Sequence, residues 1–565
     1  MRPAELSHRT RRKALETLSR DEFDVLVIGG GITGAGIARE AALRGLRVAL
    51  VERRDFAVGT SSRSSKLIHG GLRYLQQGDV GLVIEAANER RVLRRLAPHL
   101  ARPLRMVVPV QGRSGWAKIR AGLWTFDKMA RVTREERNQM LDREEALALE
   151  PLLDAEKVYG AGVYYECLTD DARLVLENVK SAAAYGAVVA NYATVTSFLS
   201  EDGRITAGVV HDTLADTAFP VRAKVVVNAG GPWVDAVRLL QGNAEKPRLH
   251  LTKGIHLILP RERLPVRNTI VMTASDRRSV FVVPRGDVVY LGTTDTNYVG
   301  PYDDPAVTVE DAHYLLEAAN RTFAVDELGL ADVVGAWAGL RPLLHEEGKA
   351  PSEISRKDEI MVSDKGLISI AGGKLTTYRK MSERILTMIL TQLAESETSP
   401  PEQSVAASDE ARLCGGDIEE PMEAYLDRLR RKWAGVDADV VERLVATYGT
   451  NGERMVEGIA AEPILGERCA PGSAVTRAEV EYAVREEMAL TLQDFLDRRA
   501  RLFLWDPGNG LDEAEAAARF MAAKLGWNAA RITSEVAEYR THVQTTLAFA
   551  QPETPAGEAP RAAFA

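Results

Sequence analysis

Short apolar runs alternate with glycine turns and helical patterns in the first part of the chain. The run from Asp24 to Ile28 leads directly into Gly29-Gly30-Gly31-Ile32-Thr33-Gly34, and an alanine-rich helical pattern then extends to Arg44. A second apolar run, Val48 to Val51, ends at Glu52. Strand, glycine turn, helix and strand in this order predict a βαβ unit that binds a dinucleotide.

Each glycine of this turn has its own task. Gly29 permits the tight turn, Gly31 lets the backbone approach a pyrophosphate, and Gly34 lets the helix pack close to the strand. The helix N-terminus presents free N–H groups to a phosphate. Glu52 stands where a carboxylate accepts hydrogen bonds from ribose hydroxyls, and its charge disfavours a 2′-phosphate and therefore NADP. The alternative is a glycine-rich turn without a ligand.

Two later segments repeat the order of strand, glycine turn and helix. Val225 to Asn228 precedes Ala229-Gly230-Gly231-Pro232-Trp233, and Leu367 to Ile370 precedes Ala371-Gly372-Gly373-Lys374. NAD enzymes normally have one compact nucleotide unit, whereas the longer FAD is contacted by segments scattered along the chain. The three turns therefore favour FAD. The alternative is that the later two are ordinary βα turns in which glycine allows close packing.

Strand patterns also lie between the glycine turns, at Ile255 to Leu259, Val280 to Val283 and Val288 to Gly292. We interpret them as a substrate sheet inserted into the nucleotide-binding domain. The predicted fold class is α/β, with a Rossmann-like FAD-binding domain interleaved with a mixed-sheet substrate domain and followed by a C-terminal helical domain.

A polar segment with two prolines, Ala394 to Val405, predicts a linker before the helical domain. Within that domain, Thr476 and Glu479 have the spacing of a capping box at the start of a helix. The expected boundaries are a basic N-terminal arm at 1–20, an FAD-dependent oxidoreductase region at 21–400, a C-terminal helical domain at 404–548 and a disordered tail at 549–565. Inside the oxidoreductase region we expect FAD-binding segments at about 21–100, 165–250 and 330–400, and substrate-domain segments at about 101–164 and 251–329.

Composition places the chain among soluble globular proteins, since 45% of its 565 residues are hydrophobic and 27% are charged. The net charge of −8 gives no overall attraction to nucleic acid. The three cysteines form no CxxC pair, which argues against a metal site or a disulfide scaffold. We find no apolar run near the roughly 18 residues of a membrane-spanning helix and no signal-peptide core after the basic residues before Asp21. We therefore expect an intracellular protein without a metal or a nucleic-acid partner.

The segment from Thr60 to Tyr74 is the densest polar loop of the chain. It combines hydroxyls, cations, an imidazole and a double glycine without an acidic residue. Because it follows Glu52, we expect it to run along the cofactor, with its hydroxyls near phosphate and flavin oxygens. A solvated loop is the alternative.

Six motifs carry a family resemblance. They are GGGITGAG from Gly29, SSKLIHGGLRYL from Ser64, KGIHL from Lys253, GTTDTNY from Gly292, GLRPL from Gly339 and AGGKLTTYRK from Ala371. Together, over about residues 24–381, they resemble the FAD-dependent glycerol-3-phosphate dehydrogenases that pass electrons to respiratory quinone. The resemblance implies a D-amino-acid-oxidase-like fold with FAD as the cofactor, and it leaves a homodimer open.

The resemblance also implies sn-glycerol 3-phosphate as the substrate and dihydroxyacetone phosphate as the product. In the family, the phosphate is bound by the Arg-Tyr of HGGLRY, the Arg of GLRPL and a later Arg; here these are Arg73, Tyr74, Arg341 and Arg356. Guanidinium groups suit a phosphate monoester because they offer forked donors to its negative charge. Thr293 is a further expected substrate contact, although its TTD segment is equally typical of an ordinary turn.

Removal of a hydride and a hydroxyl proton requires a base and a positive guide for the developing carbonyl. His256 is the candidate base because imidazole titrates near neutral pH; a histidine satisfied within a strand is the alternative. Arg341 would orient the oxygen, and Lys374 would place a positive charge near the flavin. The expected cofactor-binding residues are Gly29, Gly31, Gly34, Glu52, Arg53, Thr60, Ser61, Ser62, Ser65, Lys66, His69, Gly70, Gly71, Val195, Ala229, Gly230, Trp233, Gly339, Gly373, Lys374, Leu375 and Thr376.

Quinone lies in the membrane, so such an enzyme has to dock there. One apolar stripe has helical spacing with basic residues largely on other faces; its members are Trp116, Ile119, Leu123, Phe126 and Ala130. The stripe indicates either an interfacial helix or a core-packed helix with solvated basic residues. On the first interpretation, the protein is cytoplasmic and peripheral on the inner face of the cell membrane.

Other functions of the same fold remain alternatives. A glycerol-3-phosphate oxidase would pass electrons to oxygen and release hydrogen peroxide, and the basic aromatic segment favours the quinone-linked enzyme over it. An amine or amino-acid oxidase would recognise a carboxylate with one arginine, not with a cluster. A non-catalytic FAD-binding sensor would not require SSKLIHGGLRY and GLRPL together.

Overall fold

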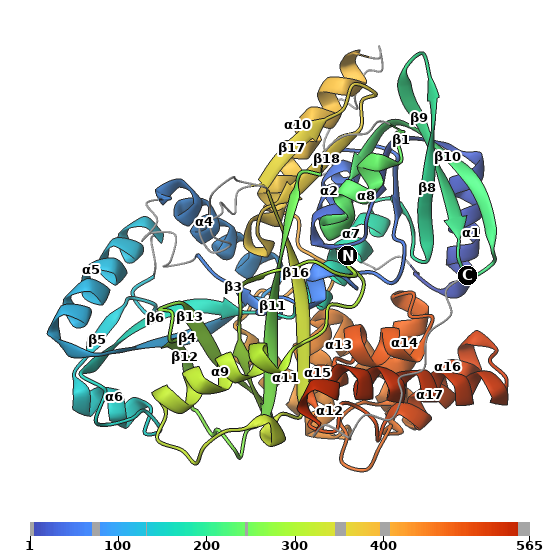
Figure 1. The fold of residues 1–565 in the computed structure, drawn as a ribbon. Helices are drawn as coiled ribbons and strands as arrows, with labels where there is room; N and C mark the ends of the chain where they lie inside the picture. Colours follow the sequence, from blue (N-terminus) through green and yellow to red (C-terminus); the bar gives the residue numbers. More distant parts are fainter. Residues whose placement is uncertain are drawn as a thin grey trace, which may run out of the picture.

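Two β-sheets and a C-terminal group of helices make up the computed structural model, which describes residues 5–70, 79–130, 133–242, 247–344, 358–395 and 407–551. Figure 1 shows the first sheet beside the N-terminal helix α1, the second sheet with helices α5 and α6 at its far edge, and the C-terminal helices below the first sheet. The long strands β11 and β16 run between these parts.

The first sheet carries the three predicted glycine turns. Its strands are β1 (Glu22–Ile28), β2 (Val48–Val51), β7 (Val188–Ala190), β8 (Ala193–Glu201), β9 (Arg204–Asp212), β10 (Thr217–Asn228), β17 (Asp358–Val362) and β18 (Ile368–Gly372). The order β17-β18-β10-β1-β2-β7 contains parallel pairs from β18 to β7. The carboxyl ends of β1, β10 and β18 therefore meet at one edge, and each of them leads into a glycine turn.

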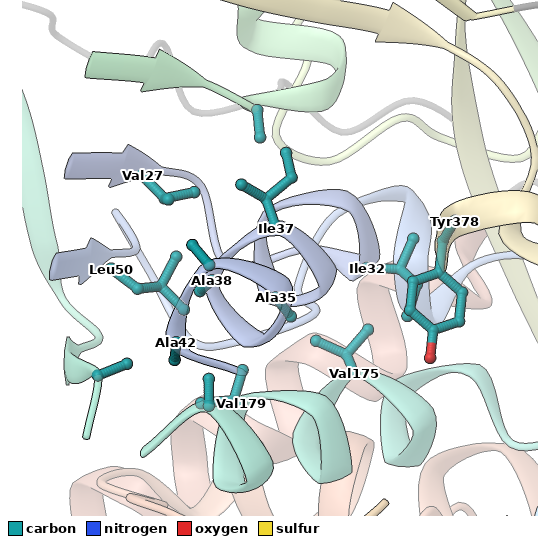
Figure 2. Packing of buried hydrophobic residues seen from close by; sticks show 14 of the residues in the cluster. Val27, Ile32, Ala35, Ile37, Ala38, Ala42, Leu50, Val175, Val179 and Tyr378 are labelled. Atoms are coloured by element: carbon teal, nitrogen blue, oxygen red, sulfur yellow. The ribbon is translucent and has the colours of Figure 1, made fainter. Parts of the chain in front are cut away.

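Helix α2 (Ile32–Leu43) is the centre of the largest apolar cluster of this part (Figure 2). Val27 and Leu50 of the sheet face it from one side, and Val175 and Val179 of α7 face it from the other. Its alanines have short side chains, so the sheet and α7 both approach its backbone closely. The helix is thereby fixed with its N-terminus at the edge where the glycine turns meet.

The second sheet is mixed. Its strands are β3 (Leu67–Ile68), β4 (Arg102–Val110), β5 (Gln139–Leu141), β6 (Gly160–Leu168), β11 (Leu249–Pro260), β12 (Thr269–Thr273), β13 (Ser279–Arg285), β14 (Val288–Gly292), β15 (Thr296–Asn297) and β16 (Gly335–Leu344). β12 pairs with β4 in parallel and the other pairs are antiparallel. β16 pairs with β11 along its whole length, although we expected residues 330–400 in the FAD-binding part.

The remaining helices cover the sheets and form the C-terminal region. Before the predicted linker they are α1 (His8–Arg20), α4 (Val80–Leu96), α5 (Gly112–Ala130), α6 (Arg143–Leu149), α7 (Asp171–Ala184), α8 (Val234–Leu239), α9 (Val309–Thr322) and α10 (Tyr378–Glu395). After it they are α11 (Met422–Lys432), α12 (Ala438–Tyr448), α13 (Thr450–Ala461), α14 (Arg477–Glu486), the π-helix η6 (Asp494–Arg499), α15 (Leu502–Trp505), α16 (Ala514–Leu525) and α17 (Ala529–Thr546). Most of the linker predicted at 394–405 lies outside the described residues, which omit 396–406.

The segment expected as a basic arm forms helix α1, which packs on β7 and β10. Ser7 caps this helix in a capping box with Thr10. Arg11 turns inward and forms a buried ion pair with Asp212, with a distance of 2.7 Å between the guanidinium nitrogen and the carboxylate oxygen. Part of the basic charge of this segment is thus used for packing and is not offered to solvent.

The capping box predicted at the start of α14 does not form. Thr476 makes no side-chain cap, and Glu479 instead accepts hydrogen bonds from Arg443 and from the Tyr448 hydroxyl. An arginine partner from another helix therefore outweighs the local cap.

The predicted apolar stripe on α5 is a core-packed face. Leu123 and Phe126 are fully buried, and Ile119 packs against the same cluster beside β6 and α4. The interfacial interpretation of this stripe is therefore wrong, although the side chain of Ala130 lies outside the described residues. Among the helices of the described ranges, we find none with the length and apolar character needed to cross a bilayer.

The first residues of the segment expected as a disordered tail, 549–551, are ordered. A short 3₁₀ helix covers Ala548–Ala550, and Phe549 packs against the core cluster of the second sheet. The tail from residue 552 lies outside the described residues.

Helix α7 joins the first sheet to the C-terminal helices. Its residues 171–182 are all buried, including the charged Arg173 and Lys180. The ammonium of Lys180 donates to Glu487 at 3.0 Å and to the Tyr482 hydroxyl at 2.8 Å, and Arg173 also pairs with Glu487. Buried charges are stable only when they are paired, so this contact fixes where the C-terminal region sits.

Replacement of Gly34 by alanine should destabilise the first sheet and α2. A Cβ atom there would lie 1.9 Å from the carbonyl oxygen of Gly29, so α2 would have to move away from β1. We expect the free energy of unfolding to fall by about 2 to 3 kcal/mol, measured by thermal or urea unfolding followed by circular dichroism.

Gly458→Ala is the matched control. This glycine is also helical, and its added Cβ would lie 3.7 Å from the nearest atom, Leu465 Cδ1, which is an ordinary contact. Since alanine favours a helix interior over glycine by up to about 1 kcal/mol, stability should stay the same or rise. An equal loss in both variants would contradict the packing argument.

Candidate cofactor and substrate site

A cavity of about 320 Å³ lies where the glycine turns of the first sheet meet β11 and β16 of the second. Of the predicted site residues it is lined by Gly29, Gly31, Glu52, Arg53, Thr60, Ser61, Ser65, His69, Val195, Ala229, Gly230, Trp233, His256, Gly339, Arg341, Gly373, Lys374, Leu375 and Thr376. Segments far apart in the sequence are thus brought to one site, as the three-turn pattern predicts.

Some predicted site residues do not line this cavity. Gly34, Ser62, Lys66, Gly70 and Thr293 are absent from its lining, and their contacts are given below. Gly71, Arg73, Tyr74 and Arg356 lie outside the described residues. Their assignment to cofactor or phosphate therefore stays a prediction.

The first glycine turn forms an end of the cavity whose backbone suits an anion. Helix α2 begins after Gly31, which has no side chain to cap it, and the amide of Ile32 donates to Ser61 Oγ at 2.9 Å. A Cβ at Gly29 would lie 2.7 Å from the Ala229 carbonyl oxygen, so the first and second turns touch here. Uncapped N–H groups at a helix N-terminus suit a phosphate.

Glu52 lies at the same end, after β2. Its carboxylate accepts hydrogen bonds from the amides of Gly30 at 2.6 Å and Arg54 at 2.9 Å. Burial raises its pKa above the ordinary value, and the two amides oppose that shift. These residues suit FAD: the first turn of α2 would hold its pyrophosphate, and Glu52 would accept hydrogen bonds from its adenosine ribose.

The later turns approach the cavity from the other strands. In the turn after β10, the ring centroid of Trp233 lies 4.9 Å from the guanidinium of Arg53, which follows β2. After β18, Gly372 and Gly373 have φ values of +77° and +79°, a left-handed backbone that favours glycine. The Thr376 hydroxyl accepts from the amide of His69 at 3.2 Å, which joins the third turn to the polar loop.

The side chain of Lys66, a predicted cofactor-binding residue, points into the protein and does not line the cavity. Its ammonium donates to both carboxylate oxygens of Asp171, at 3.0 and 2.9 Å, and to the Ser62 carbonyl at 2.7 Å. Its side chain is fully buried behind the loop, and this burial lowers its pKa to about 7 despite the attraction of Asp171. The polar loop therefore contains residues that face inward to the protein as well as residues that face the cavity.

Three further predicted cofactor-binding residues also make contacts within the protein. Gly34 packs closely against Gly29, as its place in the motif predicts, and does not line the cavity. The Ser62 hydroxyl points back to the Gly59 carbonyl at 3.4 Å. The amide of Gly70 donates to the buried carboxylate of Glu166 at 3.1 Å, so it is already engaged by the protein.

Arg341 of β16 reaches the cavity from the second sheet. It donates to Asp295 at 3.1 Å, to the Thr293 hydroxyl at 3.0 Å and to the Thr294 carbonyl at 3.0 Å. Thr293 therefore contacts Arg341 and does not line the cavity itself. A Cβ at Gly254 would lie 2.2 Å from the guanidinium, so this glycine makes room for Arg341.

His256 of β11 is buried beside Arg341 and the polar loop. Its Nε2 lies 2.8 Å from Ser65 Oγ, and its ring stacks on Trp337 with a centroid distance of 4.4 Å. Burial lowers its pKa well below the ordinary value, and the cations Lys66 and Arg341 lower it further. The imidazole is thus neutral near pH 7, which is the form that can accept a proton.

Several lining residues were missed by the sequence analysis. Arg63, Ser64, Gly254, Gly372 and Thr33 all line the cavity. Each lies within a motif or polar segment described above, so its closeness in sequence to the predicted positions was the available signal. Asp295 was noted only as part of the TTD segment, and its role as the partner of Arg341 needed the fold.

Comparison with known proteins supports an FAD-binding site. Residues 24–379 match the FAD dependent oxidoreductase family, and residues 406–532 match the C-terminal domain of alpha-glycerophosphate oxidase. An aerobic glycerol-3-phosphate dehydrogenase of Bacillus subtilis (strain 168) is 38% identical over 525 residues, or 92% of this chain and 94% of that protein. One from Staphylococcus aureus (strain USA300) is 39% identical over 556 residues, or 97% of this chain and 98% of that protein.

A solved structure agrees along almost the whole chain. The glycerol-3-phosphate dehydrogenase from Bacillus halodurans, complexed with FAD, is 37% identical and superposes with a TM-score of 0.81 over 96% of this chain and 98% of that chain. The fold class and the FAD prediction are confirmed. The chain belongs to the FAD-dependent oxidoreductase family, among the aerobic glycerol-3-phosphate dehydrogenases.

Proposed function

We propose that this chain oxidises sn-glycerol 3-phosphate to dihydroxyacetone phosphate and passes the electrons through FAD to a membrane quinone. The observation that carries the proposal is that one cavity joins the FAD-binding turns to Arg341, His256 and Lys374. The names of the relatives that match over nearly the full length support the substrate.

Arg341 is the described residue best suited to the anionic substrate. Its guanidinium is fixed by Asp295, Thr293 and the Thr294 carbonyl, so binding requires little ordering of the side chain. A forked donor of this kind binds a phosphate or guides a developing carbonyl oxygen. Arg73, Tyr74 and Arg356, outside the described residues, would complete the phosphate contacts.

His256 is the proposed base for the hydroxyl proton. Its neutral ring faces the cavity and is oriented by Ser65 and Trp337. When bound, FAD supplies the acceptor for the C2 hydride. Lys374 lines the same cavity and stabilises negative charge that develops there.

The outer face of α5 supports docking to a membrane. Arg113, Lys118 and Arg120 are exposed on it, and Trp124 is 62% exposed with the Lys128 ammonium 5.8 Å from its ring centroid. The exposed positions described for this helix include no acidic residue. Cations with an exposed tryptophan suit the interface of an anionic bilayer. We propose that this face, and not the buried stripe, places the enzyme peripherally on the cytoplasmic side of the cell membrane.

Oxygen is the alternative acceptor, because the C-terminal region matches a domain named for an oxidase. Anaerobic titration of the holoenzyme with sn-glycerol 3-phosphate should bleach the visible flavin band, since the flavin gains two electrons. Addition of a soluble quinone analogue should restore the band rapidly, and oxygen only slowly. Fast recovery with oxygen would favour the oxidase, whereas a band that the substrate fails to bleach would refute the substrate proposal.

Replacement of Arg341 by alanine should strongly impair the same reaction. Loss of a charged hydrogen bond in a buried site costs about 3 kcal/mol, or a fall in kcat/KM of about 100-fold. Arg222→Ala is the control, because this exposed arginine of β10 lies outside the cavity lining. An unchanged kcat/KM in the Arg341 variant would remove Arg341 from the site.

Charge reversal on α5 should weaken membrane binding. We expect Lys118→Glu with Arg120→Glu to lower binding to vesicles of anionic phosphatidylglycerol by about 10-fold or more, because each basic group near such a surface contributes about 1 kcal/mol. Vesicle sedimentation measures this effect. Arg519→Glu changes an exposed arginine of α16 and should leave binding as it is. Equal binding of all three proteins would exclude the α5 face.

A further inference from the structure

The cavity-facing part of the polar loop is fixed from behind by one buried carboxylate. Asp171, the first residue of α7, has a fully buried side chain. Its Oδ2 accepts hydrogen bonds from the amide of Ser64 at 3.1 Å and from the Ser64 hydroxyl at 2.7 Å. The same carboxylate binds the ammonium of Lys66, which in turn donates to the Ser62 carbonyl. The segment from Ser62 to Lys66 is thus tied at both ends.

The cavity-facing residues of this segment contact His256 and the ring on which it stacks. Ser64 and Ser65 both line the cavity. The Ser65 hydroxyl lies 2.8 Å from His256 Nε2, and the Ser64 carbonyl accepts from the indole N–H of Trp337 at 3.2 Å. Because His256 also stacks on Trp337, a shift of the segment would move both partners that orient the imidazole.

Asp171 has a second cationic partner, which comes from the C-terminal region. Arg501, which precedes α15, donates to Asp171 Oδ1 at 3.0 Å, and its Nε lies 3.2 Å from Asp170 Oδ2. Its side chain is 3% exposed. Trp505 at the end of α15 meets the ring of Trp337 edge-on, with a centroid distance of 6.1 Å. The C-terminal region therefore contacts the residues that support His256 in two ways: Arg501 binds Asp171, and Trp505 meets Trp337.

Arg501 matters for the orientation of the Asp171 carboxylate because it supplies one of its two cationic partners. A buried carboxylate with two cations keeps a fixed orientation, whereas loss of one partner leaves a buried charge partly uncompensated. Arg501 lies outside the cavity lining, as does Asp171. Its influence on the reaction therefore passes through the residues that it contacts, and of these Asp171 is bonded directly to the loop.

We infer that Arg501 is a positioning residue: through Asp171 it fixes Ser64 and Ser65, and so orients the His256 imidazole toward the cavity. The C-terminal helical region then contributes to dehydrogenation without touching the substrate. The inference rests on the proposed function for the identity of the substrate, and on the described contacts for the position of the loop.

The test compares Arg501→Gln, Arg501→Lys and Arg11→Gln as holoenzymes. Arg11→Gln is the matched control because it breaks a buried ion pair of similar exposure, with Asp212, in helix α1, which packs on β7 and β10. Anaerobic stopped-flow absorbance measures the limiting rate of flavin reduction by sn-glycerol 3-phosphate and the half-saturating concentration. The visible spectrum of the bound FAD and its midpoint potential are recorded for each variant.

For Arg501→Gln we expect the limiting rate to fall by about 10-fold or more, with less than about a threefold change in half-saturation, since the phosphate contacts are untouched. Arg501→Lys should recover part of the rate because it restores the charge. Arg11→Gln should keep the wild-type rate and spectrum even where its thermal stability is lower. Equal rates in Arg501→Gln and wild type, or equal losses in Arg501→Gln and Arg11→Gln, would overturn the inference.

Failure of the proposed function would look different. If sn-glycerol 3-phosphate does not bleach wild-type flavin, the substrate proposal fails, and the spectrum and potential then decide the inference. A spectral shift in Arg501→Gln that is absent from Arg11→Gln would support positioning of the cavity loop, and identical spectra would overturn it. If Arg501→Gln yields no folded holoenzyme, Arg501→Lys carries the same comparison with a smaller expected loss of about threefold.

Discussion

Helix α7 imposes the constraint on which the rest of the molecule depends, because it is buried and carries charge. The side chains of Asp171, Arg173, Glu177 and Lys180 are 0% exposed. Charges in such a position require partners, and removal of one partner typically costs about 3 to 5 kcal/mol. Several of those partners, including Glu487, belong to the C-terminal region. The buried ion pairs therefore couple the FAD-binding part to the C-terminal helices, although the two parts match separate family models.

The C-terminal region also anchors the segment that follows β2, which contributes Glu52 and Arg53 to the cavity lining. Asp55, shortly after Glu52, is buried and accepts hydrogen bonds from Arg498 and Arg499 of the π-helix η6. The segment after β2 and the polar loop are thus both held by C-terminal arginines, one through Asp55 and the other through Asp171. A rigid scaffold behind a binding site keeps its cavity-facing groups in place at little entropic cost on ligand binding.

Elements that are determined by residues close in sequence could be predicted. The roles of residues whose partners are distant in sequence could not. The turn at Gly29 and helix α2 follow from nearby glycines, alanines and apolar runs, so both were expected where they occur. Lys66 has the same local signature as the serines around it, but its partner Asp171 lies 105 residues away. The α5 stripe was ambiguous for a related reason: an apolar helical face needs a partner to define it as core, and the second sheet that supplies this partner becomes visible only in the fold.

The electrostatics of His256 connect the site to the proposed substrate. Two cations, Lys66 and Arg341, add to burial in lowering the pKa of its imidazole, which keeps it neutral but makes it a poor proton acceptor. A phosphate bound at Arg341 would cancel part of that positive field, because opposite charges at short range offset one another in a buried site. The pKa of His256 would then rise only while the substrate is present. On the proposed function, the anion that Arg341 binds therefore also prepares the base that removes its proton, and the neutral histidine of the free enzyme is consistent with that role.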